Sequence, residues 1–138
     1  MSGADLRGSR ALGPKSSGLK STMQAVDFDR FSVALLVLRD DAPDLDAAAA
    51  AALQDAHMAH LADLHEAGHL LAAGPLMNDR FRGLSILAAE PDEARRLKEQ
   101  DPAVQAGRFM VLVMPWMVPA GAMTFTPSHF PRSIAEVE

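Results

Sequence analysis

The chain has 138 residues, a formal net charge of −5 and no cysteine. This length is enough for one domain with a modest core, and the absence of cysteine excludes a disulfide framework, a thiolate metal site and a cysteine nucleophile. Residues 1–22 hold four basic side chains and one acidic side chain, so the rest of the chain carries about −8. Because this acidic part has no basic stripe, we expect no binding to nucleic acid.

The first segment, residues 1–25, is predicted to be a disordered extension because it is rich in Gly and Ser and has no hydrophobic period. It contains basic residues but lacks the continuous apolar region of a signal peptide. No apolar run in the chain approaches the roughly 20 residues needed to cross a bilayer. We therefore expect a cytoplasmic protein without a membrane partner, with one domain at 26–118 and an irregular C-terminal arm at 119–138.

The domain is expected to begin with a strand over residues 31–38 and a helix from about Asp46 to residue 67. The strand has apolar residues at both odd and even positions, which predicts that both of its faces are buried. Asp46 is a candidate N-cap for the Ala-rich helix, and Gly68 is a natural residue just past its end. At 100° per residue, one stripe of this helix collects two histidines with three leucines: Leu53, His57, His60, Leu61 and Leu64. Asp55, Ala62 and Glu66 lie opposite this stripe.

The remaining elements are predicted to be strands over 69–75, 81–88 and 109–114, with a helix over 90–100 and a helical turn or two over 102–107. The order β-α-β-β-α-β is that of the ferredoxin-like α+β fold. Two helices can cover only one face of a four-stranded sheet. The first and last strands, however, carry apolar side chains on both of their faces. A second copy of the sheet is the simplest cover, so we predict a homodimer.

Three segments carry a family resemblance: HMAHLADLHEAGHLLAAGP at 57–75, RGLSIL at 82–87, and EQDPAVQAG at 99–107 with a later Pro-Trp. Together they resemble the YciI-like (YCII-related domain) proteins over about residues 30–118. The resemblance implies a dimeric α/β barrel and a His/Asp site that matches His60 and Asp101. Most members of this family have no assigned reaction. Those that have one are lyase or isomerase relatives that act on hydroxylated aromatic or ring-cleavage compounds, so the resemblance implies a reaction of this type.

His60 and Asp101 are the predicted catalytic residues, and each has a structural alternative. His60 would act as a general acid/base near neutral pH, or it would be a core histidine that binds a backbone group. Asp101 would orient His60 and stabilise its imidazolium, or it would only cap the helical turn that begins at Pro102.

Five further residues are candidates for substrate binding. His57 lies one turn before His60, and we expect it to line the site. The other four are Gly74, Pro75, Ser85 and Arg82. Each has a structural alternative: Gly74 and Pro75 would only end a strand, Ser85 would be incidental in its strand, and Arg82 would be an ordinary surface residue. We predict no metal site, because the histidines show no metal-ligand spacing, and no cofactor, because the glycines form no phosphate-binding pattern.

Two functions remain open from the sequence. The first is a metal-independent enzyme of lyase, isomerase or hydrolase type that uses the His/Asp pair on a small, anionic or phenolic molecule. The second is a non-catalytic metabolite-binding or accessory protein of the same fold, because the fold alone cannot decide between them.

Overall fold

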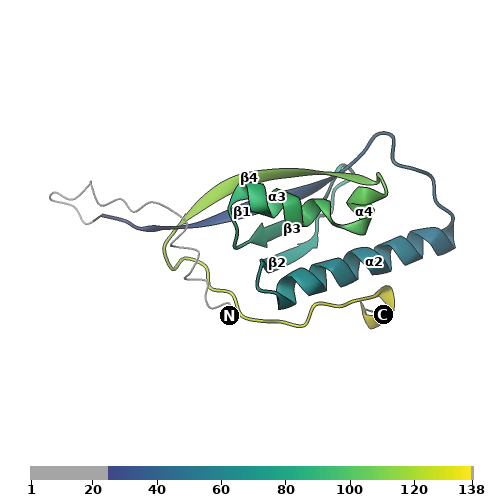
Figure 1. Ribbon diagram of the computed structural model, residues 1–138. Coiled ribbons are helices and arrows are strands. Elements are labelled where there is room, and N and C mark those ends of the chain that lie inside the picture. Colours follow the sequence, from purple (N-terminus) through teal and green to yellow (C-terminus); the bar gives the residue numbers. More distant parts are fainter. Residues whose placement is uncertain (1–24, 138) are drawn as a thin grey trace.

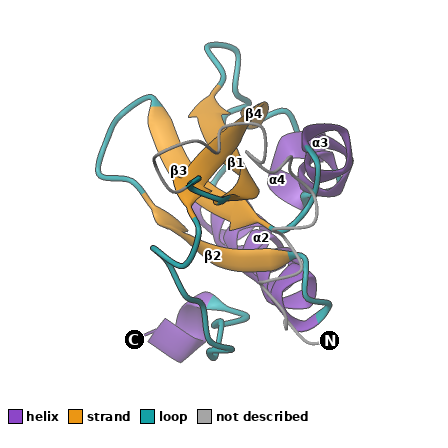
Figure 2. Cartoon of the chain, turned by 90° about the vertical axis from the view of Figure 1, so that its left-hand side faces the viewer, coloured by secondary structure: helices purple, strands orange, loops and turns teal. Residues whose placement is uncertain are grey.

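The computed structural model describes residues 25–137. Four antiparallel strands form one sheet in the order β2-β3-β1-β4, and the helices lie on one side of it (Figures 1 and 2). This arrangement confirms the predicted ferredoxin-like α+β fold. The predicted N-terminal extension lies, apart from residue 25, outside the described residues. The elements are β1 (Phe28–Leu38), α2 (Ala47–Glu66), β2 (Leu70–Pro75), β3 (Phe81–Leu87), α3 (Pro91–Glu99), α4 (Pro102–Gln105), β4 (Phe109–Pro119) and the 3-10 helix η3 (Ile134–Val137).

Helix α2 begins and ends as the sequence predicts. The carboxylate of Asp46 accepts a hydrogen bond of 2.8 Å from the Ala49 N–H, which is the usual N-cap geometry. Past the last turn, Gly68 has a φ of 87°, a conformation that favours glycine. The N–H groups of Gly68 and His69 then donate to the carbonyls of His65 and Leu64, which is a Schellman motif. The chain thereby reverses directly into β2.

The main hydrophobic core lies between the sheet and the helices. It combines inward-facing strand residues with one side of each helix, and its buried members are aliphatic except for Phe109. Its buried residues are Ala34, Leu36, Leu64, Leu70, Leu87, Ala89, Ala94, Ala103, Phe109 and Val111.

The side of α2 opposite the histidine stripe is partly covered, because the C-terminal arm lies along it (Figure 1). Ala62, which lies on this side, is only 1% exposed. On the same side, Asp55 accepts a hydrogen bond from the Ile134 N–H at 2.8 Å, and Asp63 binds Arg132 at 2.8 Å. The C-terminal arm therefore covers a second side of α2. The apolar stripe of the helix does not predict this cover.

The second face of the sheet carries an apolar row along β4. Among residues 25–137, none of the helices lies over this face (Figure 2). We call Met110, Leu112, Met114 and Trp116 the β4 row; these side chains are 37–42% exposed. In the register of β1 and β4 they pair with Val37, Leu35, Val33 and Phe31. The arm covers only one end of this face, where Phe125 packs edge-on against Phe31 with 5.6 Å between ring centroids.

Candidate functional site

Asp101 is the centre of the polar cluster between α2, the α3–α4 corner and the sheet. It is fully buried and is the N-cap of α4, where its Oδ1 accepts a hydrogen bond of 2.8 Å from the Ala103 N–H. Pro102 occupies the next position, which suits the first turn of a helix because its missing N–H needs no partner there. The local sequence Asp-Pro-Ala thus fixes the carboxylate rigidly and leaves its second oxygen for another donor.

That donor is His57, whose Nδ1 lies 2.6 Å from Asp101 Oδ2. Since an ionised carboxylate only accepts hydrogen bonds, Nδ1 carries the hydrogen and Nε2 carries the free lone pair. The His57 side chain is 14% exposed while that of Asp101 is 0% exposed. Within residues 25–137 no protein group hydrogen-bonds to His57 Nε2. A partly exposed imidazole ring is therefore held in place by a buried carboxylate.

The electrostatics of this pair favour the carboxylate anion. Burial alone would raise the pKa of Asp101, but the hydrogen bond from His57, the positive charge of that ring when protonated and the Ala103 N–H together hold the pKa below its usual value. Asp101 therefore stays ionised at neutral pH and can stabilise a positive charge on His57.

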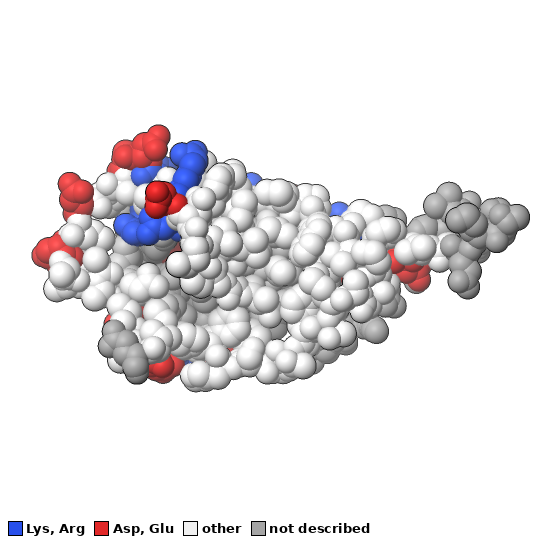
Figure 3. All heavy atoms as spheres, turned by 180° about the vertical axis from the view of Figure 1, so that it is seen from behind, with Lys and Arg blue, Asp and Glu red and all other residues white. Residues whose placement is uncertain are grey.

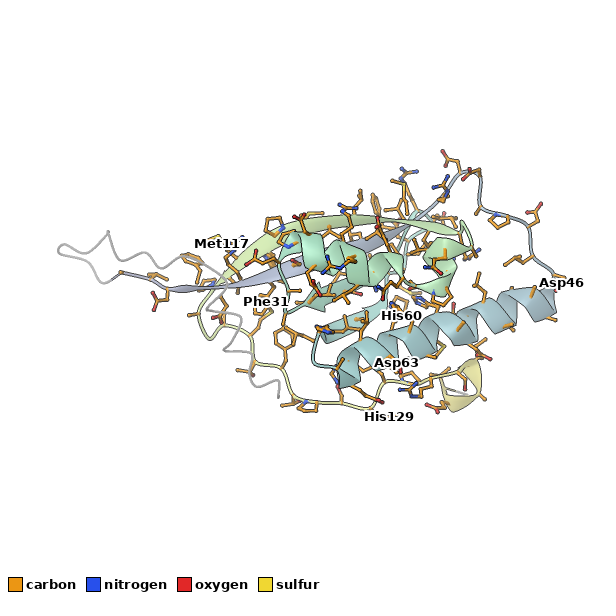
Figure 4. The ribbon with its side chains drawn as sticks, viewed as in Figure 1. Phe31, Asp46, His60, Asp63, Met117 and His129 are labelled. Carbon is orange, nitrogen blue, oxygen red and sulfur yellow. The ribbon has the colours of Figure 1, made fainter. Side chains whose placement is uncertain are left out.

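His60 does not pair with Asp101, which corrects the pairing that the sequence predicted. Its Nε2 donates to the backbone carbonyl of Leu97 at 3.1 Å, and burial lowers its pKa despite the nearby charge of Asp101. His60 is thus neutral near pH 7 and ties α2 to the last turn of α3. This backbone hydrogen bond is the one expected of a core histidine. Figure 4 shows His60 on the side of α2 that faces α4 and Asp63 on the side that faces the arm.

Lys98 is a member of the cluster that the sequence analysis missed. It lies on α3 and is fully buried, and its Nζ donates to Ser85 Oγ on β3 at 3.1 Å. Burial lowers the pKa of Lys98 to about 8, although the charge of Asp101 opposes this effect. The signal that could have found it is its spacing, because Lys98 follows the fully buried Ala94 by one turn on the predicted helix.

The other predicted binding residues are not brought to this cluster. Gly74 pairs with Leu84, the neighbour of Ser85, so by alternation it belongs to the other face of the sheet. Pro75 ends β2 and is exposed. Arg82 donates to the carbonyl of Asp79 at 3.4 Å within the turn between β2 and β3. Of the five candidates, only His57 and Ser85 lie with Asp101 and Lys98.

The acidic and imidazole side chains of the cluster do not form a set of metal ligands. Among residues 25–137, no group of three or more His, Asp or Glu side chains is arranged to hold a metal ion. Asp101 gives its oxygens to His57 and to the backbone of α4 instead. The Asp101 carboxylate is thus engaged in a pair with the imidazole of His57 and in a helix cap.

Comparison with known proteins assigns the family. The family model of the YCII-related domain matches residues 33–117, which include all four strands in part or whole and helices α2, α3 and α4. The chain belongs to the YCII-related domain family.

Comparison with individual proteins adds one solved structure. It is 5-chloro-2-hydroxyhydroquinone dehydrochlorinase (TftG) from Burkholderia phenoliruptrix AC1100 in complex with 2,5-dihydroxybenzoquinone. It is 23% identical to this chain, the match covers 62% of this chain and 92% of that chain, and the TM-score is 0.48. No curated protein matches the chain. In the part of the chain that the structure describes, none of the helices is long and apolar enough to span a membrane.

Proposed function

We propose that the chain is a metal-independent enzyme that acts on a small molecule, with His57 as general acid/base and Asp101 as the residue that positions it. The observation that carries this proposal is the 2.6 Å hydrogen bond from His57 Nδ1 to a fully buried carboxylate. This geometry fixes the tautomer of the ring and stabilises the imidazolium that forms when Nε2 takes a proton.

The chemistry that such a pair supports is proton transfer. His57 Nε2 would remove a proton from a C–H, O–H or water at the site and return it later to the product or leaving group. Elimination, isomerisation and hydrolysis all need this step, so the proposal names a lyase, isomerase or hydrolase. His60 would serve the site indirectly, because its hydrogen bond to Leu97 holds the α3–α4 corner that carries Asp101.

The test compares His57→Gln with the matched control His60→Gln. Turnover is sought over a panel of small hydroxylated and halogenated aromatic compounds and lactones, with products identified by mass spectrometry. His57→Gln should lower kcat/KM by about 100-fold or more, as expected when a general acid/base is lost, while His60→Gln should lower it by less than about tenfold. A His57→Gln protein with unchanged turnover would exclude the assignment. A panel that gives ligands without turnover would favour a metabolite-binding protein instead.

We also propose that two copies pair through the free face of the sheet. The β4 row is apolar and 37–42% exposed in the single chain, and contiguous exposed apolar patches of this kind mark interaction surfaces. Figure 3 shows this face with the Lys, Arg, Asp and Glu side chains gathered near its ends rather than over its middle. A second copy of the same row is self-complementary, as a two-fold interface requires.

A further inference from the structure

Lys98 has a position that packing alone does not explain. It is 0% exposed and lies on the side of α3 that contains the fully buried Ala94. Lysine is almost never fully buried unless it is paired, because its flexible stem normally carries the ammonium to water. A residue such as Leu or Met would fill the same space without burying a charge.

The pairing of the Lys98 ammonium within the protein is incomplete. In the described part of the chain it makes one hydrogen bond, to the neutral Ser85 Oγ at 3.1 Å, and no ion pair. An ammonium has three donors, so two of its hydrogens have no acceptor among the described residues. The charge of Asp101 is near enough to affect the pKa of Lys98, but the hydrogen bonds of its oxygens go to His57 and to the Ala103 N–H rather than to Lys98.

The charges around Lys98 favour an anion. While His57 is neutral, the charges of Lys98 and Asp101 balance. Once His57 takes a proton, the cluster holds two positive charges and only the one carboxylate of Asp101, while His60 stays neutral because burial lowers its pKa. An ionised oxygen beside Lys98 would balance this excess. The hydroxyl of Ser85 accepts from Lys98 and keeps its own hydrogen to donate to the same oxygen.

We propose that Lys98 and Ser85 form the binding site for an ionised oxygen of the substrate, a carboxylate or a phenolate, next to His57. This inference rests on the proposed acid–base function and adds the two residues that hold the ionised oxygen of the substrate. The ligand would enter on the His57 side, which is the partly exposed edge of the cluster. The four-carbon stem of Lys98 lets its ammonium turn from Ser85 toward a ligand there.

The test measures binding of two probes of nearly equal shape to the full chain. The probes are 2-hydroxybenzoate, which carries a carboxylate, and 2-hydroxybenzamide, which is neutral at the same position. In calorimetric titration, 2-hydroxybenzoate should bind at least about tenfold more tightly than 2-hydroxybenzamide, since only the anion forms a charge-assisted hydrogen bond. Lys98→Met should remove this preference, and Ser85→Ala should weaken it.

The matched control is Arg96→Met, which removes a positive charge from the exposed side of the same helix. It should leave the preference for the anion unchanged. A preference that survives in Lys98→Met, or wild-type protein that binds neither probe or binds both equally, would overturn the inference. Binding needs no proton transfer, so turnover that persists in His57→Gln would exclude the acid–base proposal while the preference for the anion remained.

Discussion

Asp101 performs two structural tasks with one buried carboxylate. One oxygen caps α4 through the Ala103 N–H, and the other binds His57. Because the cap fixes the backbone and side chain of Asp101, the His57 ring is held by a partner that cannot turn away. Such preorganisation is what a proton-transfer group needs, since a ring in the wrong tautomer or orientation transfers protons poorly.

At the same scale, Lys98→Met is expected to make the folded protein more stable near pH 7. Burial lowers the pKa of Lys98 from 10.5 to about 8, so the unfolded chain binds this proton more tightly, and burying the charge costs roughly 3 kcal/mol. Loss of the hydrogen bond to Ser85 offsets about 1 kcal/mol of the gain. The free energy of unfolding in urea should therefore rise by about 2 kcal/mol.

The pH dependence of this gain identifies its cause. Between pH 8 and 10.5 the unfolded chain holds more protons than the folded chain, so wild-type stability rises with pH. The advantage of Lys98→Met should therefore fall through zero, because only the loss of the hydrogen bond to Ser85, about 1 kcal/mol, remains once Lys98 is neutral. Arg96→Met is the control and should change stability little at either end of this range. If Lys98→Met were less stable than wild type at pH 7, the Lys98 charge would be better paired than the structure indicates.

Part of the cluster could be predicted from single residues and part could not. The helical stripe placed both His57 and His60 toward the sheet. The family resemblance marked Asp101 as a site residue, and the Asp-Pro pair marked it as a helix cap. Which histidine reaches Asp101 depends on how the α3–α4 corner sits against α2, and a helical wheel does not contain that information. Lys98 was missed because a charged residue on a short helix is usually solvated.

At the scale of elements, the C-terminal arm is expected to stabilise α2 mainly through Phe130. Its ring stacks on His65 with 4.1 Å between centroids and packs against the main core. Phe130→Ala should lower the free energy of unfolding by about 1–2 kcal/mol. Arg132→Ala, which removes exposed ion pairs with Asp63 and Glu66, should lower the free energy of unfolding by less than Phe130→Ala does, because solvent screens exposed ion pairs. The reverse order in thermal denaturation would mean that charge, rather than packing, holds the arm.

Most element boundaries could be predicted because they depend on local signals such as the Asp46 cap, Gly68 and Pro91. Strand β4 was predicted too short, with its end at Met114 before Pro115, but it continues to Pro119. The reason is its place at the edge of the sheet, where a proline can be accommodated because one side of the strand needs no hydrogen-bond donor. Edge position is a property of strand order and is not visible in the segment itself.

At the scale of the whole molecule, the uncovered β4 row predicts a dimer of twice the 14.7 kDa chain mass in light scattering. Met114→Glu should yield monomers at micromolar concentration, because a charge in the middle of an apolar interface loses its hydration. Met77→Glu is the matched control, since Met77 is 97% exposed in the turn after β2, and it should remain dimeric. Wild-type protein that is monomeric under the same conditions would exclude this interface.

The measurement that tests the central claim most directly is a heteronuclear NMR spectrum of the imidazole rings in wild type and Asp101→Asn. The structure predicts that His57 carries its hydrogen on Nδ1, with a strongly hydrogen-bonded proton that shifts or disappears in Asp101→Asn. The Nε2–H of His60, which donates to the Leu97 carbonyl, should stay nearly unchanged. If the NMR signals of His57 stayed unchanged in Asp101→Asn while those of His60 shifted, the result would contradict the His57–Asp101 pair and the function proposed from it.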